Sequence, residues 1–122
     1  MEVVTFEILF ETLKKLLVKR GMDIKEVKDL AFYILSFFGF GDYVVDNMLA
    51  PSDRHVFNML EEMGILRTFE DEVNITRGKI WRIHYWTYRK DVIEHIFTGE
   101  EEEEEENLEE LYDKIFKEHG EI

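Results

Sequence analysis

The chain has 122 residues, of which 45% are hydrophobic, with no cysteine and a formal net charge of −13 at pH 7. This length suits one modest core rather than two domains, and the lack of cysteine excludes disulfide scaffolds, thiolate metal sites and cysteine nucleophiles. Because no apolar run approaches about 18 residues and the first residues lack a basic signal segment, we expect a soluble cytoplasmic protein with no membrane contact.

Two amphipathic helices are predicted in the first third of the chain. Residues 5–20 carry apolar side chains at helical spacing, with Thr5 as the N-cap and Gly21 after the last turn. Asp23 begins a second helix with the spacing of a capping box, and Gly39 ends it. Each helix has an apolar stripe that can pack on a common core.

The middle of the chain is predicted to be helical as well. Residues 41–48 are expected to form a short helix, after which the chain breaks and starts again near Pro51. Pro51 suits a first helical turn, and Ser52 or Asp53 can act as the cap. This third helix is expected to end at Gly64.

A β-hairpin is predicted to follow. Residues 65–69 and residues 79–88 are rich in β-branched and aromatic side chains, which favour strands. We assign the acidic residues 70–72 and the pair at positions 77–78 to the turn region, with residues 73–76 extending either strand. Alternation in the second strand groups three residues on one face, which we expect to be the core side: Trp81, Ile83 and Tyr85.

The end of the chain is predicted to contain one more helix and an acidic segment. Asp91 is expected to cap a helix that Gly99 interrupts, and residues 100–106 are seven consecutive glutamates. Residues 1–99 contain 13 Lys and Arg against 16 Asp and Glu, a net charge of −3, whereas residues 100–122 contain 2 against 12, a net charge of −10. Most of the negative charge therefore belongs to the last 23 residues.

An amphipathic C-terminal helix is predicted after the glutamate run. Its apolar stripe consists of Leu108, Leu111, Tyr112, Ile115 and Phe116. The stripe can dock on a second subunit to form a homodimer or on the same chain, and the acidic segment can fold over the basic residues 77–90 and compete with an anionic partner. The expected organisation is one domain over residues 1–98, then a Glu-rich linker and amphipathic helix over residues 99–122.

The order of these elements resembles a winged helix-turn-helix domain. The resemblance covers roughly residues 5–97, and its most specific part is Leu60-Glu61-Glu62-Met63-Gly64-Ile65-Leu66 followed by the hairpin that ends at Tyr88. It implies an α+β fold, mostly helical with a β-hairpin wing, plus the acidic C-terminal helix. The chain is also similar to small uncharacterised archaeal proteins of this class, in agreement with a composition rich in Glu and Lys and free of Gln, which is typical of hot-growing organisms.

The resemblance implies a set of residues that bind nucleic acid. In winged-helix domains the helix before the hairpin enters the major groove of double-stranded DNA, and the wing touches the backbone or the minor groove. The residues that carry over, with a neighbouring strand cation, are Arg54, His55, Asn58, Arg77, Lys79 and Arg82. Because Arg54 is the only strong cation of that helix, residues 77–90, with five Lys and Arg, no acid and several aromatics, are the main basic surface.

No catalytic pattern accompanies these residues. The four histidines lie on separate elements without metal-ligand spacing, no Gly-rich phosphate loop is present, and neither serine has the setting of a nucleophile. We therefore expect a non-enzymatic protein without cofactor or metal.

Two functions stay open at this point. The first is a transcription-associated regulator that binds DNA through its basic, aromatic hairpin, either weakly or through a dimer. The alternative is a protein-interaction module in which the wing aromatics and the acidic tail contact another protein. A basic patch formed by Arg54, Arg77, Lys79 and Arg82 would favour the first, whereas dispersal of these cations or their pairing with residues 70–72 would favour the second.

Overall fold

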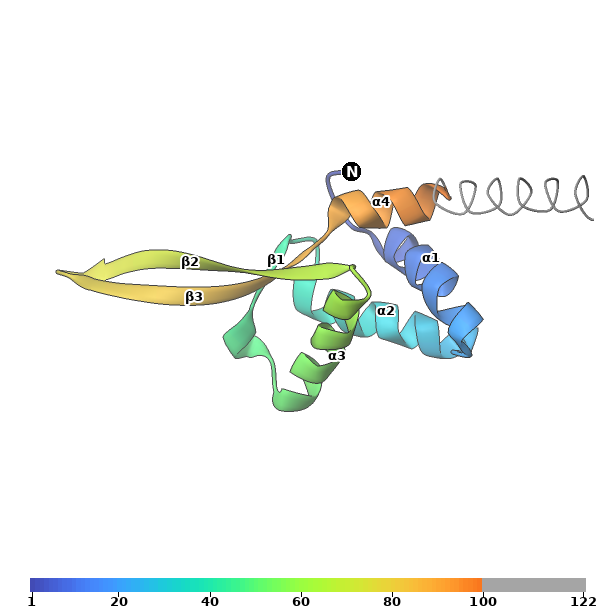
Figure 1. Ribbon diagram of the computed structural model, residues 1–122, viewed down its shortest axis with the longest axis horizontal. Coiled ribbons are helices and arrows are strands. Elements are labelled where there is room, and N and C mark those ends of the chain that lie inside the picture. The colour runs from blue at the N-terminus through green and yellow to red at the C-terminus, as the bar shows by residue number, and fades with distance from the viewer. Residues whose placement is uncertain (100–122) are drawn as a thin grey trace, which may run out of the picture.

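The computed structural model of this chain describes residues 1–99 and has an α+β fold, as predicted (Figure 1). The predicted C-terminal helix and linker, residues 100–122, lie outside the described residues. The elements follow in the order α1 (Phe6–Leu17), η1 (Val18–Arg20), α2 (Ile24–Phe38), β1 (Tyr43–Val45), η2 (Asp46–Met48), α3 (Pro51–Glu62), β2 (Leu66–Thr76), β3 (Lys79–Tyr88) and α4 (Lys90–Thr98), where η denotes a short 3₁₀ helix.

The first two helices form where their sequence patterns predict them. The Thr5 hydroxyl accepts a hydrogen bond from the Ile8 N–H at 3.3 Å, so Thr5 caps α1. Asp23 caps α2, although its carboxylate holds the N–H of Lys25, at 2.7 Å, rather than that of Glu26 as in a full capping box. Local caps and apolar stripes are therefore sufficient to locate these helices.

The prediction of a helix over residues 41–48 is wrong. Tyr43, Val44 and Val45 form strand β1, and only Asp46–Met48 turns into a 3₁₀ helix. The strand is antiparallel to β3, with Val44 opposite Trp86 and almost completely buried. Pairing with a strand some 40 residues away in sequence outweighs the local pattern here, and β-branched and aromatic side chains fit that pairing.

Helix α3 begins at Pro51, with Ala50 rather than Ser52 or Asp53 at the cap position. Asp53 instead lies at the third helical position, where its carboxylate accepts the Ala50 N–H at 3.0 Å. The same carboxylate accepts a hydrogen bond from the Tyr33 hydroxyl of α2. Burial and this contact raise the pKa of Tyr33 to about 12.

The hairpin is longer than predicted, because the acidic residues 70–72 belong to β2 and not to the turn. Glu70 lies opposite His84 and Glu72 opposite Arg82 in the ladder, so the Glu72–Arg82 pair places opposite charges on adjacent strands. The turn itself is only Arg77 and Gly78, and Gly78 has the left-handed φ of 75° that favours glycine. One residue near the tip, Ile75, bulges out of the register.

The three strands form an antiparallel sheet in the order β1-β3-β2, and the helices cover one face of its base. Trp86 packs edge-on against Phe57 of α3 with ring centroids 5.5 Å apart, and Tyr88 stacks on Phe38 of α2 at 4.1 Å. Both side chains are buried. The core face therefore carries Trp86 and Tyr88, and the prediction that Trp81 and its face neighbours point into the core is wrong.

The last described helix, α4, packs against α1 and closes the core. The Lys15 ammonium donates to the carbonyls of Ile96 and Phe97, both at 3.1 Å, and so satisfies the C-terminal end of α4. The N-cap is Arg89, and Asp91, which the sequence predicts as the cap, lies within the first turn. Its charge still suits the positive end of the helix dipole.

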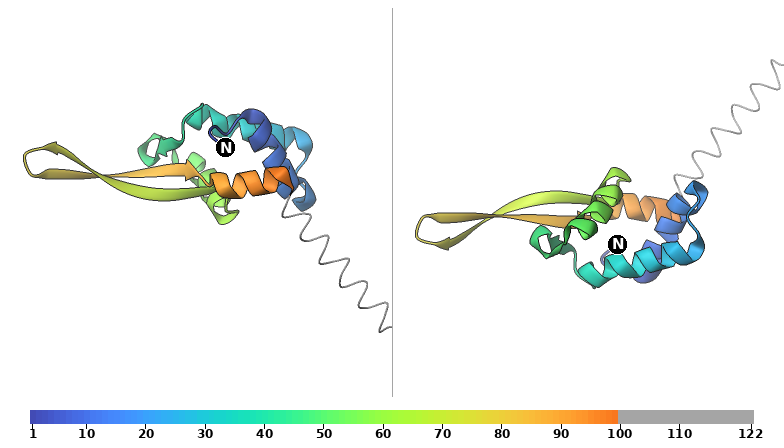
Figure 2. Two further views of the ribbon diagram at one scale, coloured as in Figure 1. Left: turned by 90° about the horizontal axis from the view of Figure 1, so that it is seen from above. Right: turned by 90° about the horizontal axis from the view of Figure 1, so that it is seen from below.

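The outer half of the hairpin extends well past the helices (Figures 1 and 2). Every residue from 71 to 82 is exposed, whereas the last three residues of β3 are buried. The hairpin thus has a base that belongs to the core and an outer part that contacts no helix in any of the three views.

Candidate functional site

Arg54, the strong cation of α3, is held by the protein itself. Its Nε lies 3.1 Å from Asp46 Oδ1, and its Nη2 donates to Asp46 Oδ2 at 3.1 Å. The Trp86 indole N–H donates to the same carboxylate at 2.8 Å. The hydrogen bond from Trp86, together with the Arg54 guanidinium, holds the pKa of Asp46 below its ordinary value of 3.8, although partial burial opposes this. Arg54 therefore joins α3 to η2 and, through Asp46, to β3.

His55 and Asn58 lie exposed on α3, as predicted. The neighbouring exposed side chains at the end of this helix are Glu61 and Glu62, which are acidic. The surface of α3 therefore presents no cation besides Arg54 within the described part of the chain.

The predicted cations of the hairpin are separated from α3, and Arg82 is separated from the two at the tip. Arg82 Nε lies 3.4 Å from a carboxylate oxygen of Glu70 and 3.5 Å from one of Glu72, so its charge is balanced by its own hairpin. At the far tip, Arg77 lies in the exposed turn and the exposed Lys79 begins β3. The six residues predicted to bind nucleic acid thus lie on α3, in mid-hairpin and at the tip, without forming one basic patch, and whether they bind nucleic acid stays a prediction.

One face of the hairpin is apolar. The register pairs Phe69 with Tyr85, Asp71 with Ile83 and Val73 with Trp81, and directly opposite residues of antiparallel strands project to the same side. We call this side the apolar face and define it by Phe69, Val73, Trp81, Ile83 and Tyr85. Asp71 is the carboxylate that interrupts it.

The apolar face is partly packed at its base and open toward its tip. Phe69 stacks on Tyr85 with ring centroids 5.0 Å apart, and Tyr43 of β1 packs edge-on against Phe69 at 5.3 Å. Farther out, Val73 is 37% exposed and Trp81 is 59% exposed. Large aromatic and β-branched side chains are therefore left in water where no helix covers the sheet.

The opposite face of the outer hairpin is mainly polar. It carries Glu70, Glu72, Arg82 and His84, with Ile80 as the apolar exception. At the base, this same face is the one that the helices cover. No helix covers either face of the outer hairpin, yet one of its two faces is apolar. The solvated face of an antiparallel sheet normally carries polar side chains.

The sequence interpretation missed Val73 and Asp71 as members of a site, because it placed the acidic residues in a turn. A usable signal was present in the period-two spacing of Phe69, Val73 and Ile75, which continues the strand through the acidic residues. That spacing alone gives the shared face and not its exposure, which depends on where the helices end.

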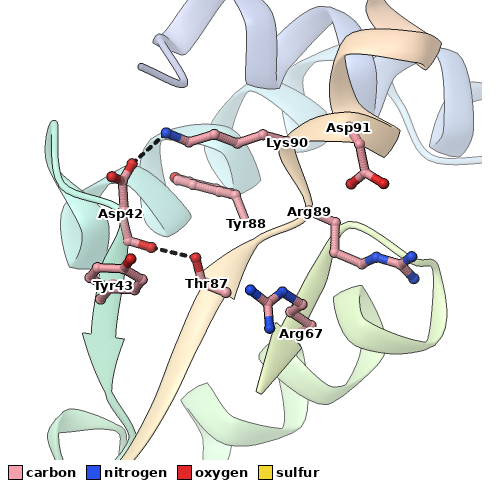
Figure 3. Close-up of a pocket in the computed structure, with 8 residues that line it drawn as sticks. All are labelled: Asp42, Tyr43, Arg67, Thr87, Tyr88, Arg89, Lys90 and Asp91. Atoms are coloured by element: carbon pink, nitrogen blue, oxygen red, sulfur yellow. Dashed lines mark hydrogen bonds and ion pairs between the residues drawn. The ribbon is translucent and has the colours of Figure 1, made fainter. Parts of the chain in front are cut away.

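A polar hollow of about 290 Å³ lies at the base of the hairpin, beside the start of α4 (Figure 3). Lys90 Nζ lies 2.6 Å from Asp42 Oδ1, and the Thr87 hydroxyl donates to the Asp42 carbonyl at 2.8 Å. Arg67 and Arg89 also line the hollow, but their side chains extend away from each other in this view. Of the three cations that line the hollow, Lys90 is therefore paired with Asp42 and the two guanidinium groups do not point toward each other.

No chemistry is indicated elsewhere in the described part of the chain. Residues 1–99 contain no group of three His, Asp or Glu side chains placed to hold a metal ion. No helix among these residues is long and apolar enough to cross a membrane. The Tyr88 hydroxyl is buried without a hydrogen-bond partner in this region, and burial raises its pKa.

The described residues define an α+β protein with an amphipathic, projecting hairpin as its candidate contact surface. The sequence profile of DUF6015, a family of unknown function, matches residues 2–121, so the chain belongs to that family. Comparisons with curated proteins and with solved structures gave no match. The proposal for function is therefore built on the geometry of the hairpin within residues 1–99.

Proposed function

We propose that this protein is a non-enzymatic protein-interaction module that binds another protein chain through the apolar face of its hairpin. The observation that carries this proposal is the exposed Val73–Trp81 pair on a hairpin whose opposite face is polar. Complete burial of an apolar side chain of this size stabilises a complex by roughly 1.5–3 kcal/mol before entropy costs, so a protein partner that covers both would gain substantially.

We further propose that the domain is a winged helix in which the hairpin is the wing. The support is the element order α1, α2, β1, α3, β2 and β3 together with the strand order β1-β3-β2. In such a domain α3 would be the helix that reads DNA. Here its one arginine is ion-paired with Asp46, which favours use of the scaffold for protein contacts.

The charge distribution supports a protein partner over nucleic acid. Phosphate neutralisation by several cations supplies most of the affinity of DNA-binding proteins. Residues 1–99 have a net charge of −3, and of the predicted cations Arg54 and Arg82 are occupied by carboxylates. Arg77 and Lys79 at the tip are too few for a phosphate-tracking surface.

Face-specific photo-crosslinking tests the proposal. A photoreactive phenylalanine analogue is placed at position 81 on the apolar face or at position 82 on the polar face of the full-length chain in cells. Because adjacent strand residues point to opposite sides, the two variants probe opposite faces of the hairpin at the same level. We expect protein adducts from position 81 and few from position 82; equal yields from both, or none from position 81, would reject the proposal.

A DNA titration provides the complementary test. Binding of random duplex DNA to the purified full-length chain is measured against salt concentration, because the slope counts the phosphates that are neutralised. We expect no measurable binding at physiological salt. Tight, steeply salt-dependent binding that Arg77→Gln and Lys79→Gln abolish would instead support the DNA-binding alternative.

A further inference from the structure

We infer that the partner of the apolar face is a second copy of this chain, packed face to face on the outer hairpin with its strands reversed. This inference rests on the proposed function and adds the identity of the bound chain. It concerns a different surface from the predicted C-terminal helix, which lies outside the described residues.

The two charges that flank the Val73–Trp81 pair are opposite in sign and symmetric in position. Asp71 precedes Val73 by two residues on β2, toward the base of the hairpin. Lys79 precedes Trp81 by two residues on β3, toward the tip. Two residues along a strand span about 7 Å and return to the same face, so both charges border the exposed pair at equal distances in opposite directions.

A two-fold axis through the level of Val73 and Trp81 brings these charges together. The rotation reverses the strands, so the base side of one hairpin lies over the tip side of the other. Asp71 of each copy then lies over the level of the other copy's Lys79, one strand to the side. Strands are separated by about 4.8 Å and packed sheets by about 10 Å, distances that a flexible lysine side chain can bridge.

Both charges are available for such contacts. Among residues 1–99, neither the Asp71 carboxylate nor the Lys79 ammonium makes an ion pair, although Asp71 Oδ1 accepts the backbone N–H of Glu72 at 2.9 Å. A purely apolar partner would strip water from both groups without compensation, which costs free energy. A second copy supplies the opposite charge for each, twice per dimer.

The other strand cation on the apolar side of the hairpin, Arg67, lies too far from the Val73–Trp81 pair to oppose the proposed dimer. Arg67 lies over the ring of Phe69, with its guanidinium carbon 5.7 Å from the centroid. It is six residues from Val73, or about 20 Å along the strand, which is beyond the level that the turn of the second copy reaches. Apart from Arg77, which lies in the turn at the end of the overlap, the overlap therefore contains one carboxylate and one ammonium from each copy.

The size of the contact predicts a weak dimer. Only the outer part of a two-stranded ribbon is buried, which puts the interface at the low end of specific ones, below about 1,200 Å². We therefore expect association that depends on protein concentration and exchanges rapidly, rather than a permanent dimer.

Reciprocal charge reversal tests this inference by sedimentation equilibrium of the full-length chain. Asp71→Lys leaves two cations on the outer apolar face, and Lys79→Asp leaves two anions. Each variant alone is expected to associate at least about tenfold more weakly than the original chain, because like charges replace both pairs. An equimolar mixture is expected to recover association as a heterodimer, since every contact is again between opposite charges.

Glu72→Lys is the control on the polar face, because it makes the same charge change one residue away; it also removes one of the two carboxylates beside Arg82, whereas the other, Glu70, remains. It is expected to leave association unchanged, and circular dichroism of all variants checks that the exposed substitutions preserve the fold. Association through residues 100–122 would add equally to every variant. Single variants that associate like the original chain, or a mixture that does not recover, would overturn the inference.

The proposed function and this inference can fail separately. If association is insensitive to all three substitutions but position 81 still crosslinks to a different protein, the second copy is rejected as the partner. The proposed interaction module is then retained. A chain that neither associates through this face nor crosslinks from position 81 rejects both.

Discussion

Asp46 is the residue on which the base of the hairpin depends. Its carboxylate accepts the Trp86 N–H and pairs with Arg54, so one side chain connects β3, η2 and α3. Arg54, which the resemblance to winged-helix domains implies as a DNA-reading residue, therefore has a structural contact in this chain. Buried or half-buried charge networks of this kind are costly to break on one side only.

We predict that Asp46→Asn lowers the free energy of unfolding by about 1–3 kcal/mol, because the Arg54 guanidinium loses its ionised partner. The folded state lowers the pKa of Asp46, so its contribution is present above the ordinary value of 3.8 and is lost as pH falls through the lower folded value. Urea unfolding from neutral to acidic pH should show the gap to the original chain closing in acid. Asp42→Asn, at a more exposed ion pair, is the control and should cost no more than about 1 kcal/mol. A difference in unfolding free energy between Asp46→Asn and the original chain that does not change with pH would contradict the proposed role of the Asp46 carboxylate.

The two tryptophans should respond very differently to removal. Trp86→Ala leaves a cavity against Phe57 and is expected to cost about 3–5 kcal/mol, whereas Trp81→Ala removes a side chain that is 59% exposed and should cost less than about 1 kcal/mol. Denaturant unfolding of dilute protein measures both. A large loss for Trp81→Ala would mean that this ring supports the fold rather than a contact surface.

At the scale of elements, local patterns are sufficient for the helices and insufficient for the sheet. Caps such as Thr5 and Asp23 and the apolar stripes of α1 and α2 are local signals, and they locate these helices correctly. Strand β1 depends on pairing with distant β3, so its sequence could not exclude a helix. The acidic residues 70–72 suggest a turn in isolation, and only their opposition to Arg82 and His84 makes them strand residues.

For the same reason, the candidate site could be predicted only in part from the sequence. Alternation groups Trp81, Ile83 and Tyr85 correctly on one face, but the sequence does not say which face the helices cover. The structure puts the helices on the Trp86 side, which leaves the other face uncovered. Exposure is a property of how far the hairpin extends past α3, and no local pattern contains that information.

The hairpin turn offers a test at the same scale. Gly78→Ala is expected to destabilise the protein by about 1 kcal/mol, because the φ of 75° is unfavourable for alanine, while an added Cβ would meet no atom within 4 Å. Arg77→Ala, at the other turn position, should be nearly neutral. Urea unfolding distinguishes them, and equal effects would argue against strain at Gly78 as the cause.

At the scale of the whole molecule, the two ends differ in how far they are buried. The helices and the sheet base form one core, whereas the outer hairpin contributes little to that core and presents aromatic side chains to solvent (Figure 2). We propose a contact with another chain as the reason why this outer hairpin exposes a tryptophan. The predictions for Trp81 and Trp86 follow from this difference, since we propose that Trp81 supports binding, whereas Trp86 is buried in the core.

The most direct test of this account follows the two tryptophans by fluorine NMR. The full-length chain labelled with 5-fluorotryptophan gives one signal from Trp81 and one from Trp86, assigned with Trp81→Phe. We expect the Trp81 signal to shift and broaden when the protein is concentrated or placed in nuclease-treated cell extract, while the Trp86 signal stays unchanged and duplex DNA alone has no effect. A Trp81 signal that responds to duplex DNA and not to protein would contradict the account.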